Sequence, residues 1–261
     1  MPARHPLTAV FIAVVLTACA TSPTGRSQFL VVSEQSAIAA SRQAYTEMLN
    51  PLAAENRLNT DPALNKRVGP ITDRIIAQAI VMRPETRSWD WNLMVIDDPE
   101  TVNAWAMAGG KMALYTGLVR KLKPTDAELA QVLAHEIAHA LAKHSAEKMS
   151  VAAATNVGVQ TVGVATGSPV AMQGTSLLAA LALSLPNSRT MESEADQIGI
   201  ELAAKAGYDP NAAVSLWAKM AQLGGGGQLE FLSTHPAPAT RQQQLKALVP
   251  KMMPFYENAR R

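Results

Sequence analysis

The chain has 261 residues, of which 17% are charged, a formal net charge of +2 and a single cysteine. One cysteine excludes an internal disulfide. No basic cluster is interleaved with aromatic residues, so the sequence gives no support for nucleic-acid binding. Aromatic residues make up only 5% and alanine is abundant, which suits a mostly helical protein.

The first 18 residues have the features of a secretory signal. Arg4 precedes an uncharged apolar run over residues 7–16, which is too short to cross a membrane as a helix. The run leads into Leu-Thr-Ala-Cys at 16–19, a pattern that resembles the bacterial lipobox. In such proteins the signal is removed before the cysteine, which then carries lipid. A lone cysteine elsewhere would more often be a small buried apolar residue.

These features predict the processing and location of the chain. We expect residues 1–18 to be a signal peptide, Cys19 to be lipidated and residues 19–32 to form a short tether. The protein would then lie on the periplasmic side of the bacterial envelope. Ala20 is not the aspartate that retains lipoproteins at the inner membrane, which favours the outer membrane. A domain over 33–250 and a C-terminal tail over 251–261 would complete the chain.

The first half of the expected domain contains two helices and three strands. Helical spacing covers 33–49 and 61–82, with Gly69-Pro70 as a point where the second helix bends or splits. Strands are expected at 89–96, 102–107 and 112–115, the last two joined by a hairpin turn at Gly109-Gly110. A small antiparallel sheet results. Its segment from Asn103 is either an internal strand or an exposed edge to which a peptide substrate adds itself as a strand, through Asn103, Ala104 and Trp105.

The strongest chemical signal is His-Glu-x-x-His at His135, Glu136 and His139. Thr125 and Glu128 form a capping box at the start of a helix that runs without Gly or Pro to residue 145. Histidines four residues apart share a helix face, where two neutral imidazoles can bind one zinc ion and Glu136 can take a proton from water. The alternative is two histidines that pack or cap. His144 would lie about 180° from His135 on this helix and is not expected to be a ligand.

A second helix is expected from Ser188 or Asn187 to Gly207, and it offers a third ligand. Glu192 and Asp196 lie one turn apart on one face, whereas Glu194 points about 200° away from Glu192. Glu192 would bind the metal and Asp196 would orient a ligand histidine. Taken alone, the pattern would more often be a solvated acidic face.

Three further segments have less specific signals. Residues 149–188 have no charge and predict two helices joined around Ser168-Pro169, which pack in the core, at a membrane surface or against a partner. After a helix from Asp209, the glycines 224–227 are either a mobile gate or a tolerated surface loop. In the Pro-rich turn that follows, His235 is either held by backbone or positioned to stabilise an oxyanion. Arg241 would pair with a site carboxylate or bind substrate.

Together these residues resemble the zinc metallopeptidase family of HtpX and the CAAX prenyl proteases, and most closely its soluble branch of periplasmic lipoproteins, typified by BepA and LoiP. The resemblance covers nearly all of the mature chain and rests on His135–His139, 192–196, 102–110, 206–210, and 233–236 followed by Arg241. It implies an α+β, mainly α, gluzincin-type fold with one Zn²⁺ per chain. His135, His139 and Glu192 would be ligands, Glu136 and His235 catalytic, and Asp196 a supporting residue.

The resemblance also implies a function. We expect a zinc endopeptidase that cleaves misfolded or stalled envelope proteins and is attached to the membrane by lipid on Cys19. The outer-membrane assembly machinery is a candidate partner. The alternative from another class is a tethered chaperone-like or scaffolding factor whose protease activity is minor or gated. Intact Glu136 favours the enzyme, whereas the 224–227 link and a His235 that occupies the open metal position would favour the gate.

Overall fold

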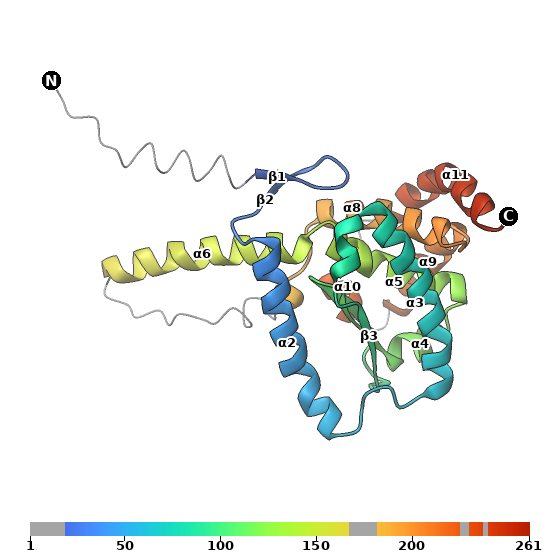
Figure 1. The fold of residues 1–261 in the computed structure, drawn as a ribbon, viewed down its shortest axis with the longest axis horizontal. Helices are drawn as coiled ribbons and strands as arrows, with labels where there is room; N and C mark the ends of the chain where they lie inside the picture. Colours follow the sequence, from blue (N-terminus) through green and yellow to red (C-terminus); the bar gives the residue numbers. More distant parts are fainter. Residues whose placement is uncertain (1–18, 167–181, 225–229, 237–239) are drawn as a thin grey trace.

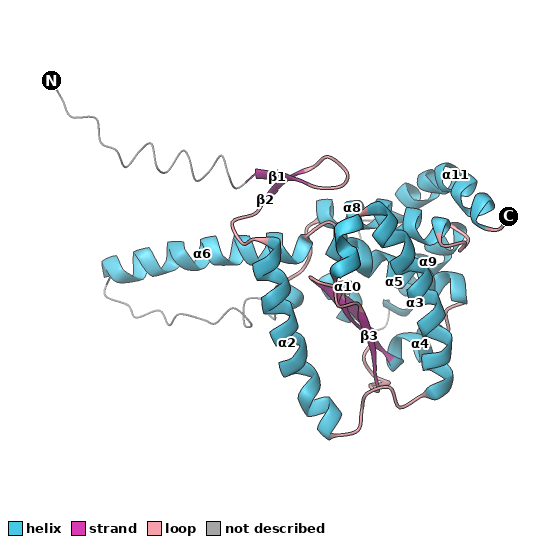
Figure 2. Ribbon diagram, viewed as in Figure 1, coloured by secondary structure: helices cyan, strands magenta, loops and turns pink. Residues whose placement is uncertain are grey.

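The computed structural model describes residues 19–166, 182–224, 230–236 and 240–261. Two helices, α5 (Asp126–Leu141) and α8 (Arg189–Lys205), pack against each other in the middle of the molecule (Figure 1). They are surrounded by α3 (Pro62–Met82), α9 (Asn211–Gly224) and α11 (Arg241–Ala259). A small sheet lies against α5 on another side (Figure 2). The core is therefore built around α5, from which fourteen side chains are buried.

The sheet has three strands, β3 (Asn92–Ile96), β4 (Ala104–Met107) and β5 (Lys111–Tyr115), in the order β3-β5-β4. β4 and β5 form the expected hairpin, with Gly109 and Gly110 at φ of 82° and 83° in its turn. The expectation of an antiparallel sheet was wrong for β3, which pairs with β5 in parallel. The hairpin inserts β5 beside β3, so β4 lies at one edge of the sheet.

The two early helices are α2 (Glu34–Ala54) and α3 (Pro62–Met82). The Asp61 side chain caps α3, which passes through Pro70 without splitting. Shorter helices follow as a 3-10 turn (Pro84–Ser88), α4 (Thr116–Leu122), α9 (Asn211–Gly224) and α10 (Glu230–Thr234). The last helix, α11 (Arg241–Ala259), includes most of the expected tail. Met252 is buried in the core, and the helix continues past it.

The segment expected to be a tether is folded onto the domain. β1 (Cys19–Thr21) and β2 (Ser27–Phe29) form an antiparallel hairpin. The buried Gln28 side chain donates to Ala142 O at 2.7 Å, and the backbone N–H groups of Val31 and Val32 donate to Ser150 Oγ. Residues 20–32 are therefore not a free spacer in the structure.

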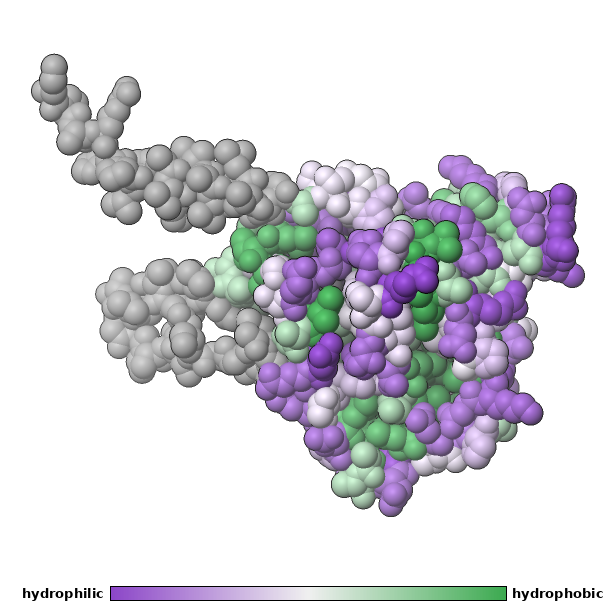
Figure 3. All heavy atoms as spheres, in the orientation of Figure 1, coloured by the Kyte–Doolittle hydropathy of each residue, from purple (hydrophilic) through white to green (hydrophobic). Residues whose placement is uncertain are grey.

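The first half of the uncharged region is the helix α6 (His144–Thr166), which extends away from the body of the molecule (Figure 1). Its beginning belongs to the core, through Ala146, Met149 and Ala152. Figure 3 shows an apolar patch where α6 leaves the body. Among the side chains whose burial is described, Phe29 of β2, Val31 just after it and Val151 of α6 are large, apolar and exposed. Within the described residues, no helix is both long and apolar enough to span a membrane. The expected signal peptide, the joint at Ser168-Pro169 and most of the 224–227 link lie outside the described residues.

Candidate active site

The helix that carries the His-Glu-x-x-His motif is fixed at both ends. At its start Thr125 Oγ1 accepts from Glu128 N, and Glu128 Oε2 accepts from Thr125 N, so the predicted capping box is present. The helix ends at Leu141, four residues earlier than expected. Lys143 has a left-handed φ of 58°, and α6 begins at His144 in a new direction. His144 is therefore not on the helix that carries His135 and His139.

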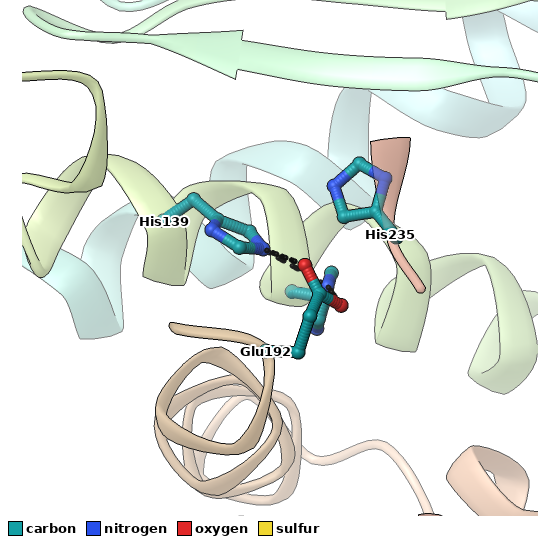
Figure 4. Close-up of side chains that lie close together, drawn as sticks. His139, Glu192 and His235 are labelled. Atoms are coloured by element: carbon teal, nitrogen blue, oxygen red, sulfur yellow. Dashed lines mark hydrogen bonds and ion pairs between the residues drawn. The ribbon is translucent and has the colours of Figure 1, made fainter. Parts of the chain in front are cut away.

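Three predicted ligand side chains converge at one buried point. His135 Nε2 lies 3.1 Å from His139 Nε2 and 3.4 Å from Glu192 Oε2, and His139 Nε2 lies 3.3 Å from Glu192 Oε1. Figure 4 shows Glu192 rising from α8 toward His139, with His235 on the far side of the same point. The four side chains offer donor atoms that all lie within 4.8 Å of one another. The motif and the second helix thus meet as the sequence predicted.

Local structure on α8 explains why Glu192 reaches this point. The predicted cap is confirmed, since Ser188 Oγ accepts from Met191 N at the first turn of the helix. Asn187, immediately before the cap, donates from Nδ2 to Glu192 Oε1 at 2.8 Å. Asn187 was not among the residues predicted for the site. The one sequence feature that could have indicated it is its position at a helix start, five residues before the candidate ligand Glu192.

Asp196 and Arg241 form a layer behind the ligands. Asp196 Oδ1 lies 3.2 Å from His135 Nδ1, the arrangement expected for a carboxylate that orients a ligand histidine. Arg241 is buried and donates from Nη1 to Glu192 at 2.8 Å and from Nη2 to Asp196 at 2.6 Å. Its guanidinium lies 3.5 Å from the Trp217 ring centroid. Of the two expectations for Arg241, the geometry favours pairing with the site carboxylates over contact with substrate.

Burial and mutual contacts shift the pKa values of the three candidate ligands in different directions. Burial lowers the pKa of His135, but its hydrogen bonds to Asp196 and Glu192 outweigh burial and raise that pKa to about 9. Burial would raise the pKa of Glu192, yet its contacts with His135 and His139 hold it well below its usual range. The pKa of His139 falls well below its usual range because of burial. An ionised Glu192 therefore faces His135, whose charged form is favoured, and His139, whose neutral form is favoured.

Glu136 points toward the open side of the site. It is buried, burial raises its pKa to about 8, and its Oε1 has no hydrogen-bond partner. His235 Nε2 lies 3.4 Å from this oxygen. The His235 ring stacks on Phe231 with centroids 4.3 Å apart, and its Nδ1 lies 2.9 Å from Thr234 Oγ1. Both expected catalytic residues thus face the same space.

A pocket of ≈ 220 Å³ opens in front of these groups, and β4 forms one of its walls. Its lining includes the predicted catalytic residues Glu136 and His235 and the predicted ligand His139. It also includes Asn103, Trp105 and Ala106 from the segment that was predicted to bind substrate. Tyr115 N donates to Asn103 O, so alternation along the strand turns the N–H and C=O groups of Ala104 and Ala106 away from β5. The Ala104 N–H donates to Asn103 Oδ1. Of the two alternatives for this strand, the structure has the edge position, and the strand presents backbone to the pocket.

Two buried residues that the sequence analysis set aside complete the rear of the site. His144 Nδ1 lies 2.8 Å from His139 Nδ1, and His144 Nε2 lies 3.1 Å from Glu194 Oε2. Glu194 was expected to point away from Glu192, and it does so toward His144. The expected position of His144, about 180° from His135, holds only for one unbroken helix to residue 145. Because the helix breaks at Lys143, His144 lies beside His139 instead.

Comparisons with known proteins agree with this site. Residues 62–249 match the model of peptidase family M48. The chain is 41% identical over 163 residues to the mitochondrial metalloendopeptidase OMA1 of Schizosaccharomyces pombe, which covers 62% of this chain and 47% of that protein. It is 29% identical over 257 residues to the metalloprotease LoiP of Escherichia coli, covering 94% and 96%. It is 31% identical over 204 residues to the beta-barrel assembly-enhancing protease of Yersinia pestis, covering 74% and 40%.

The fold and the buried His/Glu site define a metallopeptidase architecture, and the family match covers more than half of the chain. The chain belongs to peptidase family M48. The predicted family and its soluble bacterial branch are therefore confirmed. The chain spans 31% and 47% of the length of two of the mitochondrial relatives.

Proposed function

We propose that the chain is a zinc-dependent endopeptidase in which His135, His139 and Glu192 hold the ion. A tetrahedral zinc site with bonds of about 2.0–2.1 Å separates its donor atoms by about 3.3 Å. The two imidazole Nε2 atoms here lie 3.1 Å apart, His135 Nε2 lies 3.4 Å from Glu192 Oε2, and His139 Nε2 lies 3.3 Å from Glu192 Oε1, with all three residues buried. This separation is the observation that carries the proposal. It is supported by Glu192, whose contacts with the two histidines hold its pKa well below its usual range and so keep it in the ionised form that binds a metal.

Bound zinc would act as a Lewis acid toward the peptide carbonyl and would lower the pKa of water at its open position. Glu136, whose Oε1 has no other partner, takes the proton from the attacking water and delivers it to the leaving amine. Its raised pKa suits a group that must both accept and return a proton. His235 is placed to contact the developing oxyanion from the opposite wall, and Asp196 keeps His135 in the tautomer that leaves Nε2 free.

An extended peptide is the substrate that fits the pocket wall. Ala104 and Ala106 direct backbone groups away from β5, and Ala106 lines the same pocket as Glu136. A peptide added as a strand along β4 would hydrogen-bond to these groups and pass beside the catalytic carboxylate. Recognition through main-chain groups selects an unfolded or flexible chain and sets little requirement on side chains.

We further propose a place for the protein in the bacterial envelope. The lipobox-like pattern before Cys19 supports a lipid anchor on the periplasmic side, at the outer membrane. The exposed Phe29, Val31 and Val151 lie on elements next to that cysteine, which fits an apolar surface held close to lipid. Misfolded or stalled envelope proteins would be the substrates, and the relatives LoiP and beta-barrel assembly-enhancing protease support this role and contact with outer-membrane assembly.

The test compares the full-length protein with Glu136→Gln, measuring bound metal by elemental analysis and cleavage of an unfolded protein. One equivalent of zinc in both, with cleavage reduced about 10²–10⁴-fold in the variant, is the expected result. A chain that binds no zinc would overturn the metal site. Equal cleavage by both proteins would remove Glu136 from the reaction.

A second candidate is the tethered factor with gated protease activity, and one observation favours it. His235 contributes a fourth donor atom within 4.8 Å of the other three, so it can fill the position that water or substrate needs. His235→Ala separates the two functions. Faster cleavage by the variant would support the gate, whereas a loss of about 10²–10³-fold would support stabilisation of the oxyanion.

A further inference from the structure

A line of contacts joins the N-terminal hairpin to the rear of the metal site. In the turn between β1 and β2, Arg26 donates from Nε to Glu194 Oε2 at 2.8 Å. Its Nη1 and Nη2 donate to the two oxygens of Glu147 at 2.8 and 2.6 Å. Thr24 Oγ1, in the same turn, donates to Glu194 Oε1 at 2.6 Å. Both oxygens of Glu194 are thus held by a segment 168 to 170 residues away in sequence.

The hydrogen-bond roles along this line follow from the role of His139. If His139 offers its Nε2 lone pair to a metal, its proton must be on Nδ1. That N–H then donates to His144 Nδ1, 2.8 Å away, which requires a lone pair on this nitrogen and a proton on His144 Nε2. The His144 Nε2–H group then donates to Glu194 Oε2, which lies 3.1 Å from Nε2. Each step fixes the next tautomer, and the sequence of donors ends at a carboxylate anchored by Arg26.

The other ligand histidine has a shorter arrangement of the same kind. His135 Nδ1 faces Asp196 directly at 3.2 Å. α8 therefore supplies Glu192 as a ligand and two further buried carboxylates, one behind each histidine. The difference is that His139 reaches its carboxylate through a second imidazole, and this carboxylate depends on the hairpin.

We propose that His144 is a positioning residue for His139, and that Arg26 acts through Glu194 to hold it, so that the hairpin beginning at Cys19 is a working part of the metal site. The inference rests on the proposed binding of zinc by His135, His139 and Glu192. It assigns a role to two residues, Arg26 and His144, that neither helix periodicity nor the ligand motif singles out. It also places the segment nearest to the proposed lipid anchor in contact with the catalytic apparatus.

The test measures the zinc affinity of the full chain by competition with a chromophoric chelator. His144→Ala removes the acceptor for His139 Nδ1–H and should weaken zinc binding about 10–100-fold. His144→Asn keeps an acceptor oxygen close to the position of Nδ1 and should restore most of this loss. Arg26→Ala should weaken binding less, by about three- to tenfold, because Glu194 keeps Thr24 and His144 as partners.

The control is Arg67→Ala. Arg67 pairs with Asp126 at 2.7 Å near the start of α5, nine residues before His135, so its loss should leave zinc affinity unchanged. A double variant decides whether Arg26 works through His144. The combination of Arg26→Ala with His144→Ala should bind zinc as His144→Ala does, because residues in one network have non-additive effects.

Three results would overturn the inference. If His144→Ala binds zinc within twofold of the parent's affinity, His144 does not position His139. If His144→Ala does not fold, the test falls to Arg26→Ala, and an affinity equal to the parent's would show that the hairpin does not support the metal site. Additive effects in the double variant would show that Arg26 acts elsewhere. A parent that binds zinc without cleaving protein would contradict the proposed function alone, whereas a parent that binds no zinc would contradict both.

Discussion

Gly199 on α8 lies against the backbone of His135 on α5: a Cβ atom at Gly199 would be 3.0 Å from both the N and the Cα of His135. Contacts of 3.0 Å are tighter than nine in ten real Cβ contacts, so glycine allows the two helices to approach to this distance without displacing backbone. The close approach brings the carboxylates of α8 to the histidines of α5. One small residue therefore sets the spacing of the metal site.

Gly199→Ala should loosen the site. Alanine is normally better than glycine in a helix by about 1 kcal/mol, but an extra methyl group in a packed core costs about 1–3 kcal/mol. We expect a net loss of about 1 kcal/mol in the free energy of unfolding, measured by denaturant titration, and weaker zinc binding. Gly69→Ala in α3 is the control, since a Cβ there meets no atom within 4 Å outside its chain neighbours, and only the Pro70 ring limits its gain in helix propensity. A Gly199→Ala protein as stable as Gly69→Ala would contradict the argument.

Arg241 should be needed for folding more than for substrate. It is 2% exposed and is hydrogen-bonded to Glu192 and Asp196, so Arg241→Ala leaves two buried carboxylates without their common cation. We expect a loss of about 3–5 kcal/mol in the free energy of unfolding. Arg241→Lys should recover only part of this loss, because an ammonium cannot reproduce the planar guanidinium between two carboxylates. If Arg241→Ala leaves the midpoint of denaturation unchanged and alters only KM, Arg241 binds substrate and does not support the fold.

Acid should weaken the fold partly through Glu128. Burial raises the pKa of this carboxyl, but hydrogen bonds from Lys219, Ser215 and Thr125 outweigh burial and bring the pKa below its ordinary value of 4.5. A carboxyl with a lower pKa in the folded than in the unfolded state stabilises the fold above about pH 4.5. This stabilisation is lost as the pH falls through the folded-state pKa.

Glu128→Gln should therefore lose about 1–2 kcal/mol of unfolding free energy at pH 7, and the difference from the parent should shrink as the pH falls below 4.5. Glutamine keeps the acceptor of the capping box, so the effect reports the charge. Thermal denaturation from pH 3 to 7 measures it. Glu55→Gln, at an exposed position, is the control, and parallel stability curves for the parent and Glu128→Gln would refute the prediction.

The edge strand should bind substrate through its backbone. Ala106→Pro removes an N–H that points away from β5, and proline is tolerated on an edge strand. We expect the sheet to persist and KM for an unfolded protein substrate to rise about two- to tenfold, the equivalent of one hydrogen bond of about 0.5–1.5 kcal/mol. Trp105→Pro is the contrast, since Trp105 pairs with Ala113 on β5 and its loss should unfold the sheet. An unchanged KM for Ala106→Pro would mean that substrate does not lie along β4.

The sequence alone determined the parts of the site that are local. The capping box at Thr125, the four-residue spacing of His135 and His139, and the cap at Ser188 depend on contacts within a few residues, and helix geometry converts such spacing directly into position. The proposed metal donors also came from the sequence, because the residue types and their spacing restrict the chemistry. The meeting of the two helices was an expectation that the tertiary structure confirmed.

The residues that support these candidate ligands are brought to them by contacts between distant parts of the chain, which become visible in the tertiary structure. The helix break at Lys143 has no Gly or Pro to mark it, and it is stabilised where Glu147 meets Arg26 and Gln28 from the hairpin. Such contacts join residues more than a hundred positions apart, so no local pattern reports them. The parallel pairing of β3, the continuation of α11 past Met252 and the docking of the hairpin have the same origin. Each is decided by which surfaces bury one another, a property of the folded chain as a whole.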